Sequence, residues 1–212
     1  MGKMHRISEE SELSFEHGTT WSLFGGNQTD ELGDYDENEL FFQDLIKSLD
    51  DGTYDVNMIN QLKKSYYQIR GKAFSLWNSL PHGPIQGDFC PNNMVIDANE
   101  KIVGVFDWNI SGDEVFINEA CAVAIYTIFH FEWKEEVSEE NKLRAFFDAY
   151  REHRHLTKKE LEIAPVLFNI IRPFRFDRIE PILERITKNE REQVEEDVQE
   201  TVRLMQISYP SI

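Results

Sequence analysis

The chain has 212 residues, of which 41% are hydrophobic and 29% charged, and its formal net charge is −17 at pH 7. This composition is typical of a globular protein that is long enough to bury a core. The negative charge disfavours binding to nucleic acid or anionic membranes and favours a cationic partner or substrate. No apolar run reaches the roughly 18 to 20 residues that span a bilayer, so a membrane protein is excluded.

The N-terminal segment MGKMHRISEESEL lacks the apolar stretch of a signal peptide, so we expect a cytoplasmic protein. Cys90 and Cys121 are the only cysteines of the sequence. Two thiols do not make a disulfide framework or, without histidines at ligand spacing, a zinc site.

Residues 1–36 contain two short strand-like pieces, ELSF and TWSLF, followed by Gly25-Gly26 and an acidic stretch. This pattern predicts a small hairpin and then a linker.

Two helices are predicted next. The first begins at Glu37 and ends before Asp50-Asp51-Gly52, and the second runs from about Val56 to Leu80, where Pro81 stops it. Each helix has one apolar face with spacings of three and four residues. These faces consist of Leu40, Phe41, Leu45 and Leu49 in the first helix, and of Ile59, Leu62, Tyr66, Ile69, Ala73, Leu76 and Leu80 in the second.

A β-hairpin is predicted from the apolar runs MVID (residues 94–97) and IVGVF (residues 102–106), which turn residues separate. If Met94 pairs with Phe106, then Asn93 faces Asp107 at the open end of the hairpin. The preceding loop would bring Asp88 to the same end.

The segment 114–131 is apolar enough for a mostly buried helix, and the chain beyond Glu132 is predicted to be helical. Ser138 is a candidate N-cap because glutamates follow it in the first turn. Pro165, Pro173 and Pro181 are the expected breaks between helices.

The oxygen-bearing side chains near the hairpin suggest phosphoryl transfer. Mg²⁺ prefers oxygen ligands and often takes only one or two from the protein, a need that Asn93 and Asp107 fit. A separate carboxylate, Asp88, could accept the proton of a substrate hydroxyl as that hydroxyl attacks a phosphate. The adjacent Cys90 is interpreted as a small loop residue rather than a nucleophile, and Trp108 as packing beneath the metal-binding loop.

The stretch QGDFCPNNMVID, followed by VGVFDW, resembles the catalytic loop and metal-binding motif of the aminoglycoside phosphotransferase, homoserine kinase and choline kinase superfamily. The resemblance implies that Asp88 is the catalytic base, that Asn93 and Asp107 bind Mg²⁺, and that ATP is the phosphate donor. It also implies an α+β, mostly α-helical fold with the architecture of a protein-kinase-like C-lobe, and a small-molecule substrate, which the charge suggests is cationic.

The sequence departs from this family pattern in three places. Gln86 replaces the family's histidine, and either Asn118 or Glu119 stands for a later family aspartate. The family's strand lysine, which holds the nucleotide phosphates, has no counterpart, because before Lys47 the only lysine is Lys3.

We therefore expect residues 1–36 to be a residual N-lobe hairpin, hinge and linker, and residues 37–212 to be a helical C-lobe. A second polypeptide or a neighbouring subunit would then supply the N-lobe. Two other interpretations stay open: a non-catalytic binding or regulatory protein descended from such a kinase, and a truncated remnant without a selected activity.

Overall fold

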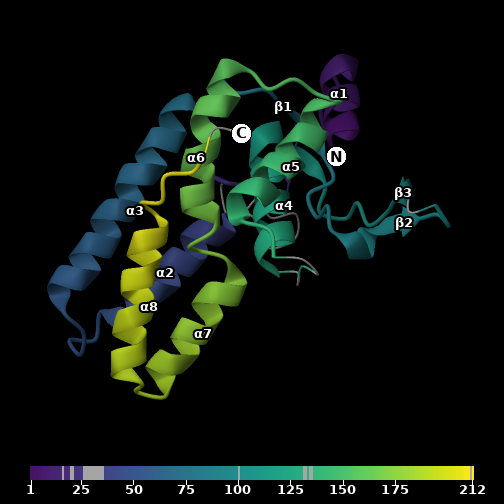
Figure 1. Ribbon diagram of the computed structural model, residues 1–212. Helices are drawn as coiled ribbons and strands as arrows, with labels where there is room; N and C mark the ends of the chain where they lie inside the picture. Colours follow the sequence, from purple (N-terminus) through teal and green to yellow (C-terminus); the bar gives the residue numbers. More distant parts are fainter. Residues whose placement is uncertain are drawn as a thin grey trace. The chain divides into compact units, whose positions relative to one another are not determined.

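The computed structural model describes residues 1–15, 17–19, 22–25, 36–99, 101–130, 133, 136–210 and 212 (Figure 1). Helices make up most of the described chain, and the strands form two small antiparallel pairs, so the predicted α+β, mostly helical fold is confirmed. In chain order the elements are α1 (Gly2–Ser11), α2 (Glu37–Leu49), α3 (Val56–Trp77), β1 (His82–Ile85), a 3₁₀ turn (Pro91–Asn93), β2 (Met94–Ile96), β3 (Ile102–Val105), β4 (Gly112–Val115), α4 (Phe116–His130), α5 (Glu139–Arg151), α6 (Lys158–Ile171), α7 (Phe176–Thr187) and α8 (Arg191–Leu204).

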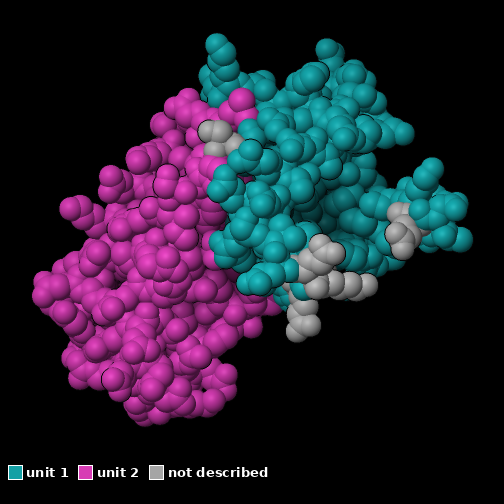
Figure 2. Space-filling model, in the orientation of Figure 1, with its two compact units in different colours: residues 1–36, 79–160, 212 teal, residues 37–78, 161–211 magenta. Residues whose placement is uncertain are grey.

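The chain forms two compact units (Figure 2). Unit 1 comprises residues 1–36, 79–160 and 212, and unit 2 comprises residues 37–78 and 161–211. The predicted boundary after residue 36 coincides with one junction between these units. The assignment of the two sides of that boundary to an N-lobe remnant and a C-lobe stays a prediction.

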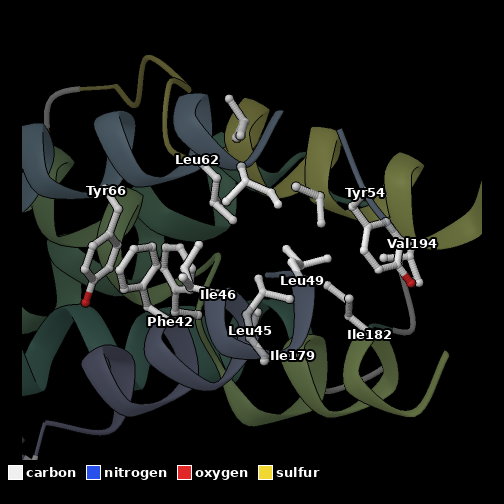
Figure 3. Packing of buried hydrophobic residues seen from close by; sticks show 14 of the residues in the cluster. Phe42, Leu45, Ile46, Leu49, Tyr54, Leu62, Tyr66, Ile179, Ile182 and Val194 are labelled. Atoms are coloured by element: carbon white, nitrogen blue, oxygen red, sulfur yellow. The ribbon is translucent and has the colours of Figure 1, made fainter. Parts of the chain in front are cut away.

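Unit 2 is a helical unit with its own apolar core (Figure 3). Helices α2, α3, α7 and α8 pack against one another, and their buried side chains meet in one cluster. Phe42 of α2 stacks on Tyr66 of α3 with 3.6 Å between the ring centroids, and Phe174 meets Tyr66 edge to face. Removing this apolar and aromatic surface from water is the main stabilising contribution to the unit.

Helices α2 and α3 begin where the sequence predicts. Leu49 ends α2, and Gly52 adopts a φ of 82° in the turn that follows. Asp55 caps α3 by accepting a hydrogen bond from the Asn57 N–H at 2.9 Å. Ser138 likewise caps α5 through the Asn141 N–H, as expected.

The expectation that every proline breaks a helix was wrong at two of the three positions. Pro173 does lie between α6 and α7, but Pro165 lies inside α6 and Pro181 inside α7. A proline within a helix removes a hydrogen bond and costs about 3 kcal/mol. In α6 the full burial of Ile163, Ala164, Leu167 and Phe168 offsets this loss, because each contributes roughly 1 to 3 kcal/mol.

Unit 1 contains a strand pair that periodicity did not indicate. His82–Ile85 pairs antiparallel with Gly112–Val115, so that Glu114 and Val115 belong to β4 and helix α4 begins only at Phe116. Helix α4 packs on both strands and on α5, and its first two turns are almost wholly buried. Among the described helices, none combines the length and the hydropathy that crossing a membrane requires.

The predicted N-terminal hairpin differs from the described structure. Residues 2–11 form helix α1, and residues 12–15 carry no strand, whereas Thr20 and Trp21 lie outside the described residues. Helix α1 precedes both strand-like pieces in the chain, and tertiary packing stabilises it, because it lies against β1 and α5. Ser8 Oγ donates a hydrogen bond to the Pro84 carbonyl at 2.8 Å, which ties α1 to β1.

The predicted β2–β3 hairpin forms, and it extends away from α4 and α5 of the same unit (Figure 1). Its register differs by one residue from the expectation, because Met94 pairs with Val105 rather than Phe106. The Asp97 N–H donates to the Lys101 carbonyl at 2.9 Å, which closes the turn. Just before the turn, the pairing of the two strands is irregular between Val95 and Ile96. As a result Asn93 lies opposite Phe106, and Asp107 is the next residue along.

Glu114 of β4 is a buried carboxyl group in unit 1. Burial raises its pKa from 4.5 to about 8, although its Oε1 accepts a hydrogen bond from the Val115 N–H at 2.6 Å, which acts in the opposite direction. The folded protein therefore keeps a proton on Glu114 at pH values where the unfolded chain has lost it.

We expect the free energy of unfolding to fall as the pH rises from about 4.5 to about 8, because between these values the folded state binds more protons than the unfolded state. In the Glu114→Gln variant this contribution disappears, so the variant gains stability relative to the wild type as the pH rises. Urea unfolding at pH 5.5 and pH 8.5 measures the difference. The control is Glu162→Gln on the exposed surface of α6, and an equal pH response of both variants would contradict the prediction.

Candidate active site

The loop between β1 and β2 carries Asp88 along a tightly constrained path. Gly87 has a φ of +88°, in the left-handed region that favours glycine. A Cβ atom at this position would lie 2.7 Å from Thr19 Oγ1 and 2.8 Å from the Ile110 carbonyl oxygen. Both the backbone angle and the space around it therefore require glycine immediately before Asp88.

The structure brings Asn93 and Asp88 together. The Nδ2 atom of Asn93 donates to Asp88 Oδ2 at 2.8 Å and to the Asp88 carbonyl oxygen at 2.9 Å. Asn93 is 6% exposed and stands at the end of the 3₁₀ turn that Pro91 begins, whereas Asp88 is exposed. The buried amide thus orients a carboxylate that faces solvent.

Gln86 connects the Asp88 loop to the end of strand β3. Its side chain is fully buried; Oε1 accepts a hydrogen bond from the Asp88 N–H at 2.9 Å, and Nε2 donates to the Asp107 carbonyl oxygen at 2.6 Å. One planar amide therefore satisfies a donor in one segment and an acceptor in the other. Gln86, the residue that replaces the family's histidine, therefore braces the Asp88 loop against the end of β3.

Asp107 directly follows Phe106, the residue that lies opposite Asn93 in the hairpin. Its φ is +61°, a left-handed conformation that aspartate and asparagine tolerate better than most residues, and its side chain is exposed. The hydrogen bond from Gln86 fixes the carbonyl group of Asp107. The Asp107 carboxylate therefore extends from a backbone that is held in place.

The donor set fits a Mg²⁺ site of the kind that substrate phosphates and water complete. Both amide contacts of Asn93 use Nδ2, so among the described residues no hydrogen bond occupies Oδ1, the atom that a hard cation takes. Asp107 adds an exposed carboxylate. Within the described part of the chain, no three His, Cys, Asp or Glu side chains converge on one point, as a self-sufficient metal cage would require.

Glu119 and His5 support the Asp88 loop from the interior of unit 1. Glu119 Oε1 accepts a hydrogen bond from the Gly87 N–H at 2.7 Å, so it is Glu119, and not Asn118, that contacts the loop. Its other oxygen, Oε2, lies 2.5 Å from Nε2 of His5. Sequence reasoning missed His5, since neither a motif nor a periodic pattern distinguishes a single histidine in α1.

The expectations for two neighbouring residues have different outcomes. Burial, followed by the negative charge of Asp88, raises the pKa of the Cys90 thiol, which disfavours the nucleophilic thiolate and agrees with a structural loop residue. Trp108, by contrast, does not pack beneath the loop: it is 46% exposed and donates its indole N–H to the Val105 carbonyl. With Gln86 and side chains of α1 it lines an apolar pocket of about 210 Å³.

We expect Gly87→Ala to lower the free energy of unfolding by about 2 kcal/mol, because the left-handed backbone alone costs an alanine roughly 1 to 2 kcal/mol and the Cβ would also press on the Ile110 carbonyl. Chemical denaturation measures this loss. Gly71→Ala is the matched control: it lies inside helix α3, where an added Cβ would have no atom within 4 Å, so it should gain about 0.5 to 1 kcal/mol. Equal effects of the two substitutions would contradict the prediction.

Comparisons with known proteins bear on this geometry. The model of the phosphotransferase enzyme family matches residues 2–156, a segment that includes the Asp88 loop, the hairpin and Glu119. No curated protein matches the chain. Because the family model covers well over half of the sequence, the chain belongs to the phosphotransferase enzyme family.

Proposed function

We propose that the chain is the catalytic C-lobe of a kinase that transfers the γ-phosphate of ATP, with Mg²⁺, to a hydroxyl group of a small molecule. The observation that carries this proposal is the arrangement around Gln86: an oriented, exposed Asp88 carboxylate is held in one hydrogen-bonded unit with Asn93 and the backbone of Asp107. The net charge of −17 favours a cationic substrate.

In this proposal Asp88 is the catalytic base. Its carboxylate accepts the proton of the substrate hydroxyl as the oxygen of that hydroxyl attacks the γ-phosphorus, whose bond to the bridging oxygen breaks so that ADP leaves. The Asn93 hydrogen bond to Oδ2 limits the rotation of the carboxylate, and Asp88 is exposed, so a substrate hydroxyl can reach it. Orientation of this kind lowers the entropy cost of the reaction.

Asn93 Oδ1 and the Asp107 carboxylate would hold the metal ion. When bound, Mg²⁺ supplies positive charge to the oxygens of the transferring phosphate. The contribution of the chain is to keep these ligands in place, with Gln86 fixing the Asp107 backbone and the buried amide of Asn93 fixing its own oxygen.

We also propose that another polypeptide segment, in the same or a second chain, provides the N-lobe with the lysine that clamps the nucleotide phosphates. The β2–β3 hairpin supports this, because Val95, Ile96, Ile102 and Val103 are each about half exposed or more. An isolated two-stranded hairpin is marginal in water, and a covering segment would bury these side chains. Residues 37–212 would then act as the C-lobe, and residues 1–36 as the remnant before it.

The second candidate function is a kinase-like binding or regulatory protein without catalysis. What favours it is Gln86, which stands in place of the family's histidine. In such a protein the geometry around Asp88 would serve a ligand or partner rather than a reaction.

We expect Mg²⁺-dependent ATP binding that Asp107→Asn weakens at least about tenfold, since even indirect contacts to a metal typically change its affinity by 10- to 100-fold. Asparagine is chosen because it tolerates the φ of +61°, so that only the carboxylate charge is lost. Isothermal titration with ATP, with and without Mg²⁺, measures the affinity.

The control for this titration is Asp97→Asn in the exposed turn of the hairpin, which should bind like the wild type. Binding that is indifferent to Mg²⁺ or to Asp107 would argue against the metal site. No binding at millimolar ATP by the protein would favour the non-catalytic function for this chain on its own.

A further inference from the structure

Histidine 5 is buried inside unit 1 with both ring nitrogens engaged. Only 1% of its surface is exposed; Nε2 lies 2.5 Å from Glu119 Oε2, and Nδ1 lies 2.8 Å from the Tyr150 hydroxyl. Its ring also stacks on Phe116 with 5.0 Å between the centroids. A histidine placed in this way connects three helices, α1, α4 and α5.

The carboxylate of Glu119 transmits this contact to the candidate active site. Glu119 is 5% exposed, so both of its oxygens need partners inside the protein. One oxygen takes the His5 ring, and the other takes the Gly87 N–H. Gly87 directly precedes Asp88, and the contacts of Thr19 and Ile110 around it leave the backbone little room to move.

On the other side of His5, the network ends in charged groups. Nη1 of Arg154 donates to the Tyr150 hydroxyl at 3.3 Å and to Glu160 Oε1 at 2.7 Å, and the same guanidinium pairs with Glu9. Burial raises the pKa of Tyr150, so its hydroxyl stays protonated.

For a neutral His5 ring, every hydrogen bond in the network has a donor and an acceptor. Arg154 donates to Tyr150, Tyr150 donates to Nδ1 of His5, and Nε2–H of His5 donates to Glu119. Glu119 then accepts from the Gly87 N–H. A chain of this kind holds each member in one orientation, because rotating any group breaks two bonds.

We propose that His5 is a positioning residue for the phosphotransfer site: it holds the Glu119 carboxylate in the orientation that fixes the Gly87 N–H and so the backbone in front of Asp88. This inference rests on the proposed function, in which Asp88 is the base. Without His5, one oxygen of a buried carboxylate loses its partner, and the carboxylate then gains by turning towards water or another donor. The Gly87 N–H would be released in the same movement.

The test compares His5→Phe with His5→Gln by hydrogen exchange of individual amides, measured by NMR. Phenylalanine keeps a ring against Phe116 but has no donor for Glu119, whereas the side-chain nitrogen of glutamine lies the same number of bonds from Cα as Nε2 of histidine. We expect the Gly87 amide to exchange about tenfold faster or more in His5→Phe, since the loss of one hydrogen bond to a charged group is worth that factor. His5→Gln should restore most of the protection.

Tyr150→Phe is the second variant, because it removes only the hydroxyl that supports His5. It should speed up Gly87 exchange to a smaller degree, and it keeps the test conclusive if His5→Phe does not fold. Unchanged Gly87 protection in whichever of these variants folds would overturn the proposal. So would an equal acceleration of all amides of α4 and β4, which would make His5 a packing residue only.

A parallel titration with Mg²⁺ and ATP separates this inference from the function on which it rests. If the wild type binds ATP in a Mg²⁺-dependent way, His5→Phe should weaken that binding, because the proposed metal ligand Asn93 is hydrogen-bonded to Asp88, and His5→Gln should restore it. If binding survives His5→Phe unchanged while Gly87 exchanges faster, the positioning role is wrong. If the wild type does not bind ATP at all, the non-catalytic function is favoured for this chain on its own, and the exchange result still decides whether His5 holds the loop.

Discussion

The buried amide of Gln86 is the constraint on which the candidate site depends. A primary amide offers a donor and an acceptor within one rigid plane, and both are needed when it lies where water cannot reach it. Here they are used on two segments that are separated in sequence, the Asp88 N–H and the Asp107 carbonyl. An apolar side chain at this position would leave two backbone groups without partners. The Asp88 loop and the end of β3 would then no longer be held in a fixed position relative to each other.

A second layer of support comes from ionisable groups rather than amides. Glu119 carries a carboxylate in a site that excludes water, and it is tolerated because His5 and the Gly87 N–H both face it. The two layers differ in what they fix. Gln86 relates Asp88 to Asp107, whereas Glu119 relates the Asp88 loop to helices α1 and α5.

The two compact units differ in the kind of interaction that stabilises their interiors. Unit 2 is stabilised by an apolar and aromatic cluster among four helices, a contribution that is not directional. Unit 1 contains the residues that we propose for phosphoryl transfer, and its interior includes buried charges and amides, whose hydrogen bonds are directional. Directional contacts suit a site in which oxygen atoms must be placed precisely, and a non-directional core suits a scaffold.

Local sequence patterns are enough to predict helices α2 and α3, the presence of the β2–β3 hairpin, and a short stretch with Asp88, Asn93 and Asp107 whose residue types suit phosphoryl transfer. These follow from local rules: apolar periodicity, turn composition and the spacing within one short stretch. Tertiary structure alone decided that residues 2–11 form a helix, that β1 pairs with β4, that Pro165 and Pro181 lie within helices, and that His5 reaches Glu119. Each of these depends on contacts between residues far apart in the chain. The free energy of such contacts exceeds the local preference, and the contacts leave no periodic signal in the sequence.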